Sequence, residues 1–511
     1  MNYLSDIMKR AIFLAGLIIG LSIFSGCAQS PDQNESWLQF RGNNCSGIAG
    51  PNSTPPSDFG AEKNVLWKIA TPEGYSSPII MNDNLIITGV IREEKKYMVW
   101  NIDPVRGTIK WQREILVDTL EKVHPISSPA AATPASDGEY IYCFFPPLGL
   151  VCFDFEGEKI WESPVQFLPV AQGSGTSPIV YEDKILLNHD NYSNPRLLVF
   201  NKKNGQQLWE YNFPSSLMLP SISYSTPVIW NDQVIIHRLD QIIGINIDSG
   251  EPVWQFDVGS TGVATPVIVG DTLFVNAWMI RGDESDLGEV IDLQKLFNDS
   301  DADRDGKLSR EEFNNSYPDG ALIHDRKIEG VTTGTKLVIH WWNLGIFDQD
   351  KDNYLSKEEW GKFQEQMADY SNHGTVAVRL GGTGDITLNS TLWKSRENVP
   401  QIPSVVVRNG LLYMVKIGGI VTCIDSGDGE VIYTEKLGAP GPYLSSPLLS
   451  NGMIFFASYN GKITILKEGS AFEIINQIDL GEKIGASPVA INNRLYIRTN
   501  KHLFAFVNQQ Q

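Results

Sequence analysis

Cysteine and positive charge are both scarce in this chain of 511 residues. It has 5 cysteines, none of them adjacent to another and none in a CxxC spacing, which excludes a thiolate zinc site and a disulfide-rich scaffold. It has 41 Lys and Arg and 60 Asp and Glu, which gives a net charge of −19. Because such a surface repels phosphates, the composition argues against nucleic acid as a partner.

Long apolar runs are also missing, apart from one segment near the N-terminus. The apolar run over residues 11–23 is shorter than the roughly 20 residues of a membrane-spanning helix. It follows a Lys-Arg pair and precedes two small residues and Cys27, as in the signal of an exported bacterial lipoprotein. We therefore expect a signal peptide over residues 1–26, a lipid on Cys27, a polar tether over 27–36 and a location at the bacterial outer membrane. An ordinary signal peptide with a chance cysteine is the alternative.

One short element recurs along the chain. It consists of Ser or Thr followed by Pro, a few residues, a turn pair such as Asn-Asp or Asn-Gly, and an apolar segment. Proline limits one end of a strand, and the turn pair supplies the positive φ angles of a two-residue hairpin. The copies begin at Ser77, Thr133, Ser177, Thr226, Thr265, Ser446 and Ser487, with a looser copy at Ile402.

A second element alternates with the first. It reads Asp or Asn, three residues, Gly, three residues and Trp, and a large indole at a fixed place in a repeat implies stacked equivalent sheets. Full copies end at Trp111, Trp209 and Trp254; shorter or altered copies end at Trp67, Trp161, Trp393 and Tyr433.

The spacing of these elements predicts the fold. Successive prolines mostly lie about 39–56 residues apart, which suits one four-stranded antiparallel blade per repeat. We predict an all-β protein, an eight-bladed β-propeller whose blades cover residues 37–282 and 371–511. Residues 64–67 supply the outer strand that residues 503–507 lack, so the N-terminal strand is expected to complete the last blade.

A helical insertion is predicted within the fifth blade. Residues 283–370 contain 21 Asp and Glu and 10 Lys and Arg, so their net charge is −11. The apolar period changes there from two to about 3.6 residues. Two helical stripes follow from that period, formed by Val290, Leu293 and Phe297 and by Trp360, Phe363 and Met367.

The insertion contains two loops with the spacing of a calcium-binding EF-hand. The first runs from Asp301 to Glu312 and has carboxylates at its first, third and fifth positions, Gly306 at the sixth and a glutamate at the twelfth. The second, from Asp348 to Glu359, departs once, with Asn353 in place of glycine. Acidic surface loops without a metal are the alternative. The predicted Ca²⁺ ligands are Asp301, Asp303, Asp305, Lys307 through its carbonyl, Ser309, Glu312, Asp348, Asp350, Asp352, Tyr354 through its carbonyl, Ser356 and Glu359.

The alternating Ser/Thr-Pro and Asp-x3-Gly-x3-Trp elements resemble the tryptophan-docking repeats of the pyrroloquinoline-quinone-like β-propeller family. The opening over residues 37–42, WLQFRG, is similar to the start of many secreted members. The resemblance implies a propeller over most of residues 37–507. It does not imply one function, because the family includes quinoprotein dehydrogenases and non-catalytic lipoproteins, one of them from the outer-membrane protein assembly machinery.

We expect a non-catalytic, calcium-binding scaffold with envelope proteins or glycans as partners on the propeller face. HExxH, GxSxG, Walker and GxGxxG patterns are absent, and His189-Asp190 is the one histidine pair in a blade loop that draws attention. The alternative is a periplasmic dehydrogenase of alcohols or sugars that uses pyrroloquinoline quinone (PQQ), and a glycan-acting protein is a third reading. Cys143 and Cys152 are expected as two buried thiols, with a disulfide as the alternative.

Overall fold

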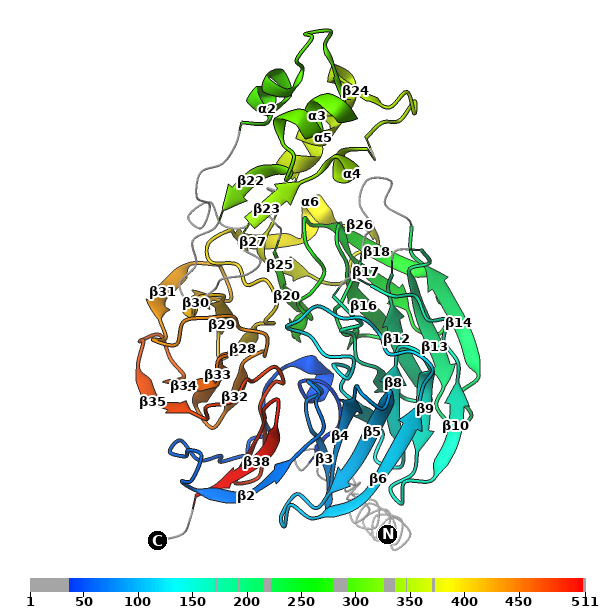
Figure 1. Cartoon of the computed structure of the whole chain (residues 1–511). Coiled ribbons are helices and arrows are strands. Elements are labelled where there is room, and N and C mark those ends of the chain that lie inside the picture. Colours follow the sequence, from blue (N-terminus) through cyan, green and yellow to red (C-terminus); the bar gives the residue numbers. More distant parts are fainter. Residues whose placement is uncertain are drawn as a thin grey trace, which may run out of the picture.

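Short apolar strands separated by turns dominate the chain. The computed structural model describes residues 36–170, 172–191, 193–214, 222–278, 292–325, 336–345, 347–369 and 373–508. Eight antiparallel sheets are arranged as blades of one closed ring (Figure 1). The predicted eight-bladed propeller is confirmed. The described residues contain no helix that is long and apolar enough to span a membrane.

Each blade runs from an inner strand to an outer strand. The first blade has β3 (Ile79–Met81), β4 (Asn84–Ile91), β5 (Lys96–Ile102) and β6 (Ile109–Leu116). The second has β7 (Ala135–Ser136), β8 (Ile141–Phe145), β9 (Gly149–Phe153) and β10 (Lys159–Ser163). The third has β11 (Ile179–Tyr181), β12 (Lys184–His189), β13 (Arg196–Asn201) and β14 (Gln207–Asn212). The fourth has β15 (Val228–Trp230), β16 (Gln233–His237), β17 (Gln241–Asn246) and β18 (Pro252–Asp257).

The second half of the ring follows the same order. The fifth blade has β19 (Val267–Val269), β20 (Thr272–Ala277), β25 (Gly374–Arg379) and β27 (Thr391–Ser395). The sixth has β28 (Val406–Arg408), β29 (Leu411–Lys416), β30 (Ile420–Asp425) and β31 (Val431–Lys436). The seventh has β32 (Leu448–Ser450), β33 (Met453–Ala457), β34 (Lys462–Lys467) and β35 (Ile474–Asp479). The eighth has β36 (Val489–Ile491), β37 (Arg494–Arg498) and β38 (His502–Val507), and it is completed by β2 (Val65–Ala70).

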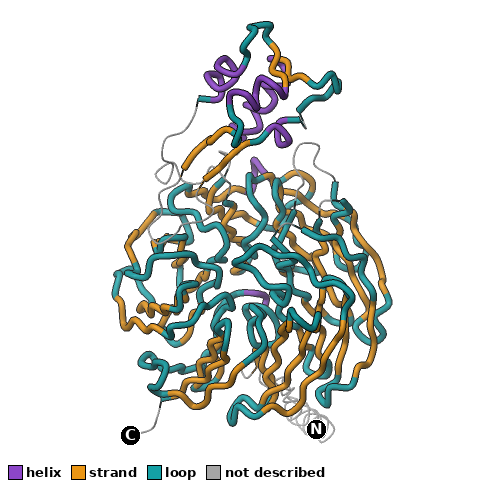
Figure 2. Tube along the Cα trace, in the orientation of Figure 1, coloured by secondary structure: helices purple, strands orange, loops and turns teal. Residues whose placement is uncertain are grey.

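Most of the helices gather in a unit that extends outward from the ring at the fifth blade (Figure 2). This unit is the insertion, described over residues 292–325, 336–345 and 347–369, and it lies between β20 and β25 of the fifth blade as predicted. Its elements are α2 (Leu293–Ser300), β21 (Lys307–Ser309), α3 (Arg310–Ser316), β22 (Ala321–Asp325), β23 (Lys336–Ile339), α4 (Trp341–Leu344), β24 (Tyr354–Ser356) and α5 (Lys357–Asp369). The sequence pattern did not indicate the antiparallel pairing of β22 with β23 between the two loops.

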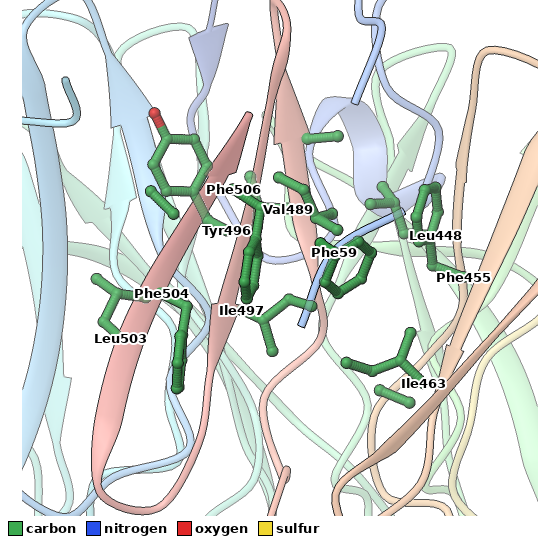
Figure 3. Packing of buried hydrophobic residues seen from close by; sticks show 14 of the residues in the cluster. Phe59, Leu448, Phe455, Ile463, Val489, Tyr496, Ile497, Leu503, Phe504 and Phe506 are labelled. Atoms are coloured by element: carbon green, nitrogen blue, oxygen red, sulfur yellow. The ribbon is translucent and has the colours of Figure 1, made fainter. Parts of the chain in front are cut away.

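The N-terminal strand closes the ring as predicted. β2 pairs antiparallel with β38, with Trp67 opposite Ala505. The junction is filled by a buried cluster in which the Phe504 and Phe506 rings stack at 5.5 Å and Phe59 packs on Phe506 at 4.5 Å (Figure 3). A strand from the start of the chain therefore holds the last blade, so the ring cannot open without unpairing residues from both ends.

The Ser/Thr-Pro repeats form a closed circle of hydrogen bonds around the axis. In each blade the backbone N–H of one Ser or Thr donates to the hydroxyl of the equivalent residue in the next blade at 2.9–3.2 Å. The circle runs through Ser77, Thr133, Ser177, Thr226, Thr265, Ser404, Ser446, Ser487 and back to Ser77. The sixth member is Ser404, so the repeat copy that we placed at Ile402 begins two residues too early, because the hydroxyl sets the register.

The tryptophans of the second repeat lock neighbouring blades together. Each indole N–H donates to a backbone oxygen in a turn of the next blade at 2.7–3.1 Å. A glycine with positive φ packs against each of these indoles, and a Cβ at that glycine would come within 2.4–3.1 Å of the indole. The pairs are Trp67 with Gly107, Trp111 with Gly157, Trp161 with Gly205, Trp209 with Gly250 and Trp393 with Gly429.

Trp254 is the exception among the full copies. Its indole donates to Gln233 Oε1 of its own blade at 2.7 Å. The next blade has no matching turn there, since its outer connection carries α6 (Thr387–Ser390) and β26 (Gly384–Asp385). β26 instead pairs in parallel with β18 and adds a fifth strand to the fourth blade. The repeat is therefore interrupted at the blade that carries the insertion.

A clasp formed by residues 36–57 crosses the ring and was not predicted. β1 (Ser36–Trp37) pairs with β3, and Asn44 exchanges two hydrogen bonds with the backbone of Ile229 in the fourth blade. The clasp includes the 3-10 helix η2 (Asn43–Cys45) and continues past Leu449 of the seventh blade. The buried side chain of Arg41 donates to the Val405 carbonyl at 2.6 Å. One segment thus ties together blades that are far apart in the sequence.

Cys143 and Cys152 are buried free thiols, as are the other two described cysteines. In the β8–β9 pairing, Cys143 lies opposite Val151 and Cys152 lies opposite Tyr142. This offset of one residue turns the two thiols to opposite faces of the blade, since side chains alternate along a strand. The predicted pair of thiols is therefore confirmed over the disulfide.

Candidate metal centre

The first acidic loop of the insertion is wound around its own carboxylates. Asp301 Oδ2 accepts from the Gly306 backbone N–H at 3.1 Å, and Asp303 Oδ1 accepts from the Asp305 N–H at 3.0 Å. Glu312 folds back over the loop, where its Oε1 accepts from the Ala302 N–H at 3.1 Å. Gly306 has φ +84°, a conformation that favours glycine. The loop therefore bends in the way that brings its first, third, fifth and twelfth residues together.

The second loop repeats these contacts. Asp348 Oδ2 accepts from the Asn353 N–H at 3.0 Å, and Asp350 Oδ1 accepts from the Asp352 N–H at 3.1 Å. Glu359 Oε1 accepts from the Gln349 N–H at 2.8 Å. Asn353 has φ +66°, so asparagine takes the left-handed conformation expected of it at the glycine position.

The aspartates of each loop can share one cation. One carboxylate oxygen from each of Asp301, Asp303 and Asp305 lies within 4.8 Å of the other two, and the same holds for Asp348, Asp350 and Asp352. Ca²⁺ binds oxygens at about 2.3–2.6 Å, so oxygens up to about 5 Å apart can contact the same ion. Asp301 Oδ1 and Asp348 Oδ1 are buried without a hydrogen-bond partner. Hard oxygen donors in this arrangement fit Ca²⁺, which would satisfy both atoms.

The two serines at the ninth positions are already engaged. Ser309 Oγ lies 2.7 Å from Glu312 Oε2, and Ser356 Oγ lies 2.8 Å from Glu359 Oε2. Ser309 also accepts from the Glu312 N–H and caps α3 in a capping box. These hydrogen bonds orient the two glutamates. Ser309 and Ser356 therefore lie in the loops as predicted, but their hydroxyls contact the predicted ligands Glu312 and Glu359.

The glutamates are held as anions. A hydrogen bond from the Ser309 hydroxyl lowers the pKa of Glu312, and backbone N–H groups lower it further. Burial raises the pKa of Glu359, but hydrogen bonds from the Ser356 backbone and hydroxyl outweigh burial and lower it overall. Ionised carboxylates are the form that binds a cation.

The two loops are joined into one unit. β21 and β24 pair antiparallel with Leu308 opposite Leu355, both fully buried. Leu293, Phe297, Trp360 and Phe363, predicted from the helical stripes, pack in the same core. Val290 and the side chain of Met367 lie outside the described residues, as does Cys27 with the predicted signal peptide.

Asp190 is paired with Arg238 rather than with the neighbouring His189. Asp190 Oδ2 accepts from Arg238 Nε at 3.0 Å, and both side chains are fully buried. Burial raises the pKa of Asp190 to about 6 and lowers the pKa of His189 to about 4. His189 packs edge-on against Phe144 at 6.4 Å. Arg238 follows β16 without a motif around it, so the sequence carried no signal for this ion pair.

Two family models match the chain. A model described as outer membrane protein assembly factor BamB matches residues 60–172, 168–277 and 384–471, which is more than half of the chain. A model described as EF hand matches residues 293–315 and 344–364. The two models divide the chain into the ring and the insertion.

A known protein is also similar in sequence. The chain is 28% identical over 227 residues to the outer membrane protein assembly factor BamB of Moranella endobia (strain PCIT), covering 42% of this chain and 50% of that protein. The match thus spans about half the length of this relative.

Solved structures are similar in fold. BamB from Moraxella catarrhalis matches with a TM-score of 0.51 and 12% identity over 87% of this chain and 99% of that one. A europium-containing methanol dehydrogenase matches with a TM-score of 0.54 and 10% identity over 93% of this chain and 98% of that one. With the repeats, the ring and the family model in agreement, the chain belongs to the outer membrane protein assembly factor BamB family of β-propellers, with an EF-hand pair inserted in its fifth blade.

Proposed function

We propose that this protein is a lipid-anchored, calcium-binding scaffold of the outer membrane that binds envelope proteins and catalyses no reaction. The family match is the observation that carries the scaffold role, because the similar protein of Moranella endobia is an outer membrane protein assembly factor. The paired acidic loops, with one buried and unpartnered oxygen in each, support calcium binding.

Calcium is proposed to have a structural role here. Extracellular calcium modules work at about 10⁻⁴–10⁻³ M, and an exported protein meets no cytosolic calcium pulse. The ion would neutralise the clustered carboxylates and hold the exit helices α3 and α5 through Glu312 and Glu359. Isothermal titration calorimetry of the purified chain should show two binding events at or below millimolar Ca²⁺. The absence of heat at that concentration would contradict the calcium proposal.

The lipid anchor is proposed to orient the ring. Ser36, where the clasp begins, pairs with Met81 beside the β3–β4 turn. The equivalent turn of the fifth blade precedes β20, whereas the insertion follows the last residue of β20, at the other end of that strand. Cys27 lies nine residues before Ser36, and a segment of that length reaches about 30 Å at most. A lipid on Cys27 would therefore keep the face of the ring that carries the β3–β4 turn near the bilayer. The connection to the insertion would leave the ring on the opposite face.

Membrane fractionation and cross-linking test the scaffold proposal. The wild-type chain should sediment with outer membranes of the native host, and Cys27→Ser should move it to the soluble fraction. In-cell cross-linking should capture outer-membrane assembly proteins, with the soluble Cys27→Ser variant as the matched control. The scaffold role at the membrane is wrong if the wild-type chain and the Cys27→Ser variant capture the same proteins, or if the wild-type chain captures no outer-membrane assembly protein.

A PQQ-dependent dehydrogenase is the second candidate. The fold it shares with a methanol dehydrogenase supports this reading, at 10% identity. Incubation of the purified chain with PQQ and Ca²⁺, followed by absorbance spectra and dye reduction with alcohols or sugars, tests it. Turnover would replace the scaffold proposal.

A further inference from the structure

The two loops differ in what each receives from its partner loop. The β21–β24 pairing places Lys307, the seventh residue of the first loop, opposite Ser356. From there its side chain reaches Asp352, the fifth residue of the second loop. Lys307 Nζ lies 2.8 Å from Asp352 Oδ2 and 5.5 Å from the centre of the Tyr354 ring. The residue of the second loop that corresponds to Lys307 is Tyr354, whose phenol is uncharged at neutral pH. The first loop therefore has no equivalent cation from this position.

The contact engages a carboxylate that a metal would use. Asp352 belongs to the carboxylate cluster of the second loop, in which one oxygen from each aspartate lies within 4.8 Å of the others. A divalent ion in that cluster would lie a few ångströms from the Lys307 ammonium, and like charges at that distance repel even through water. The ion must therefore displace the ammonium group or bind against its charge.

We propose that Lys307 is an internal counter-ion of the second loop, which weakens divalent cation binding there and makes the first loop fill first. This inference rests on the proposed calcium binding. With Lys307 in contact, the second loop is partly neutralised without metal, so the insertion keeps this loop ordered at calcium concentrations that load the first loop alone.

Calcium titration of loop-selective variants tests the inference. Glu312→Gln removes the predicted twelfth-position ligand of the first loop and leaves the second loop for measurement, and Glu359→Gln does the reverse. In the Glu312→Gln background, Lys307→Met should raise calcium affinity about threefold to tenfold, and Lys307→Arg should not. In the Glu359→Gln background, Lys307→Met should change affinity less than about twofold.

Lys295→Met is the matched control, because Lys295 pairs with Asp299 on α2 and its loss removes the same charge from the insertion outside both loops. Equal gains from Lys295→Met and Lys307→Met would overturn the inference, as would no gain from Lys307→Met. If circular dichroism shows that a glutamine variant fails to fold, a two-site calcium titration of the full chain with and without Lys307→Met decides. Lys307→Met should narrow the difference between the calcium affinities of the two loops. No calcium binding by the wild-type chain would instead refute the proposed function.

Discussion

At the scale of single residues, Asn353 and Gly306 are the clearest contrast between the two loops. Both have positive φ, +66° and +84°, and asparagine tolerates this region less well than glycine. Asn353→Gly should raise the calcium affinity of the second loop about threefold by removing backbone strain. Gly306→Asn is the reciprocal control and should weaken the first loop by a similar factor. Calorimetry measures both, and unchanged affinities would show that this position does not limit binding.

The buried ion pair between Asp190 and Arg238 is also a residue-scale feature. Arg238→Met would leave Asp190 buried and unpaired, which costs about 3–5 kcal/mol. Burial raises the pKa of Asp190 to about 6, above its usual value of 3.8. The folded protein therefore binds this proton more tightly than the unfolded chain, and the resulting stability is present at low pH and lost as the pH rises through about 6.

The Arg238→Met defect should consequently be larger at pH 7.5 than at pH 5, because protonation removes the unpaired charge. Urea unfolding at the two pH values measures it. The double variant Arg238→Met with Asp190→Asn should recover part of the stability at pH 7.5. A defect that is independent of pH would mean that lost packing of Arg238 on Phe213, 4.1 Å away, accounts for the change.

At the scale of structural elements, adjacent blades are joined by an indole that packs on a glycine turn. A Cβ on Gly205 would lie 2.4 Å from the Trp161 ring, whereas a Cβ on Gly452 would meet nothing within 4 Å. The two glycines have nearly the same φ, +69° and +70°, so an alanine is strained alike at both. Gly205→Ala should therefore cost about 1–3 kcal/mol more than Gly452→Ala, through overpacking of the blade junction.

Thermal or urea unfolding of the two glycine variants provides the comparison. Equal losses of stability would show that the docking contact adds nothing beyond the turn itself. The sequence identified this element through its Asp-x3-Gly-x3-Trp spacing, which predicts an indole between adjacent sheets, but it did not indicate which of the indoles meet a matching turn of the next blade. Trp254 shows why: its spacing is regular, yet the altered turn of the fifth blade removes its docking partner.

At the scale of the whole molecule, the ring and the insertion have separate cores. The buried cluster of the insertion contains residues from 293 to 363 alone, and the clusters of the blades contain none of them. Calcium should therefore stabilise the insertion and leave the ring nearly unchanged, because an ion stabilises the unit that binds it.

Differential scanning calorimetry should show two transitions, of which only that of the insertion rises between a chelator and millimolar Ca²⁺. The variant Glu312→Gln with Glu359→Gln is the control and should lose this response. A shift of the main ring transition by calcium would show that the insertion and the propeller unfold as one unit.

The sequence by itself determined the number of blades, the closing strand, the place of the insertion and the residues of both acidic loops. These features repeat or follow a fixed spacing, and turn chemistry and strand alternation are local properties that the residues carry with them. The contacts between distant segments were decided by the tertiary structure alone. The clasp across the ring, the Asp190–Arg238 ion pair and the contact of Lys307 with Asp352 join residues from different repeats or loops, and only closure of the ring and pairing of the loops brings them together.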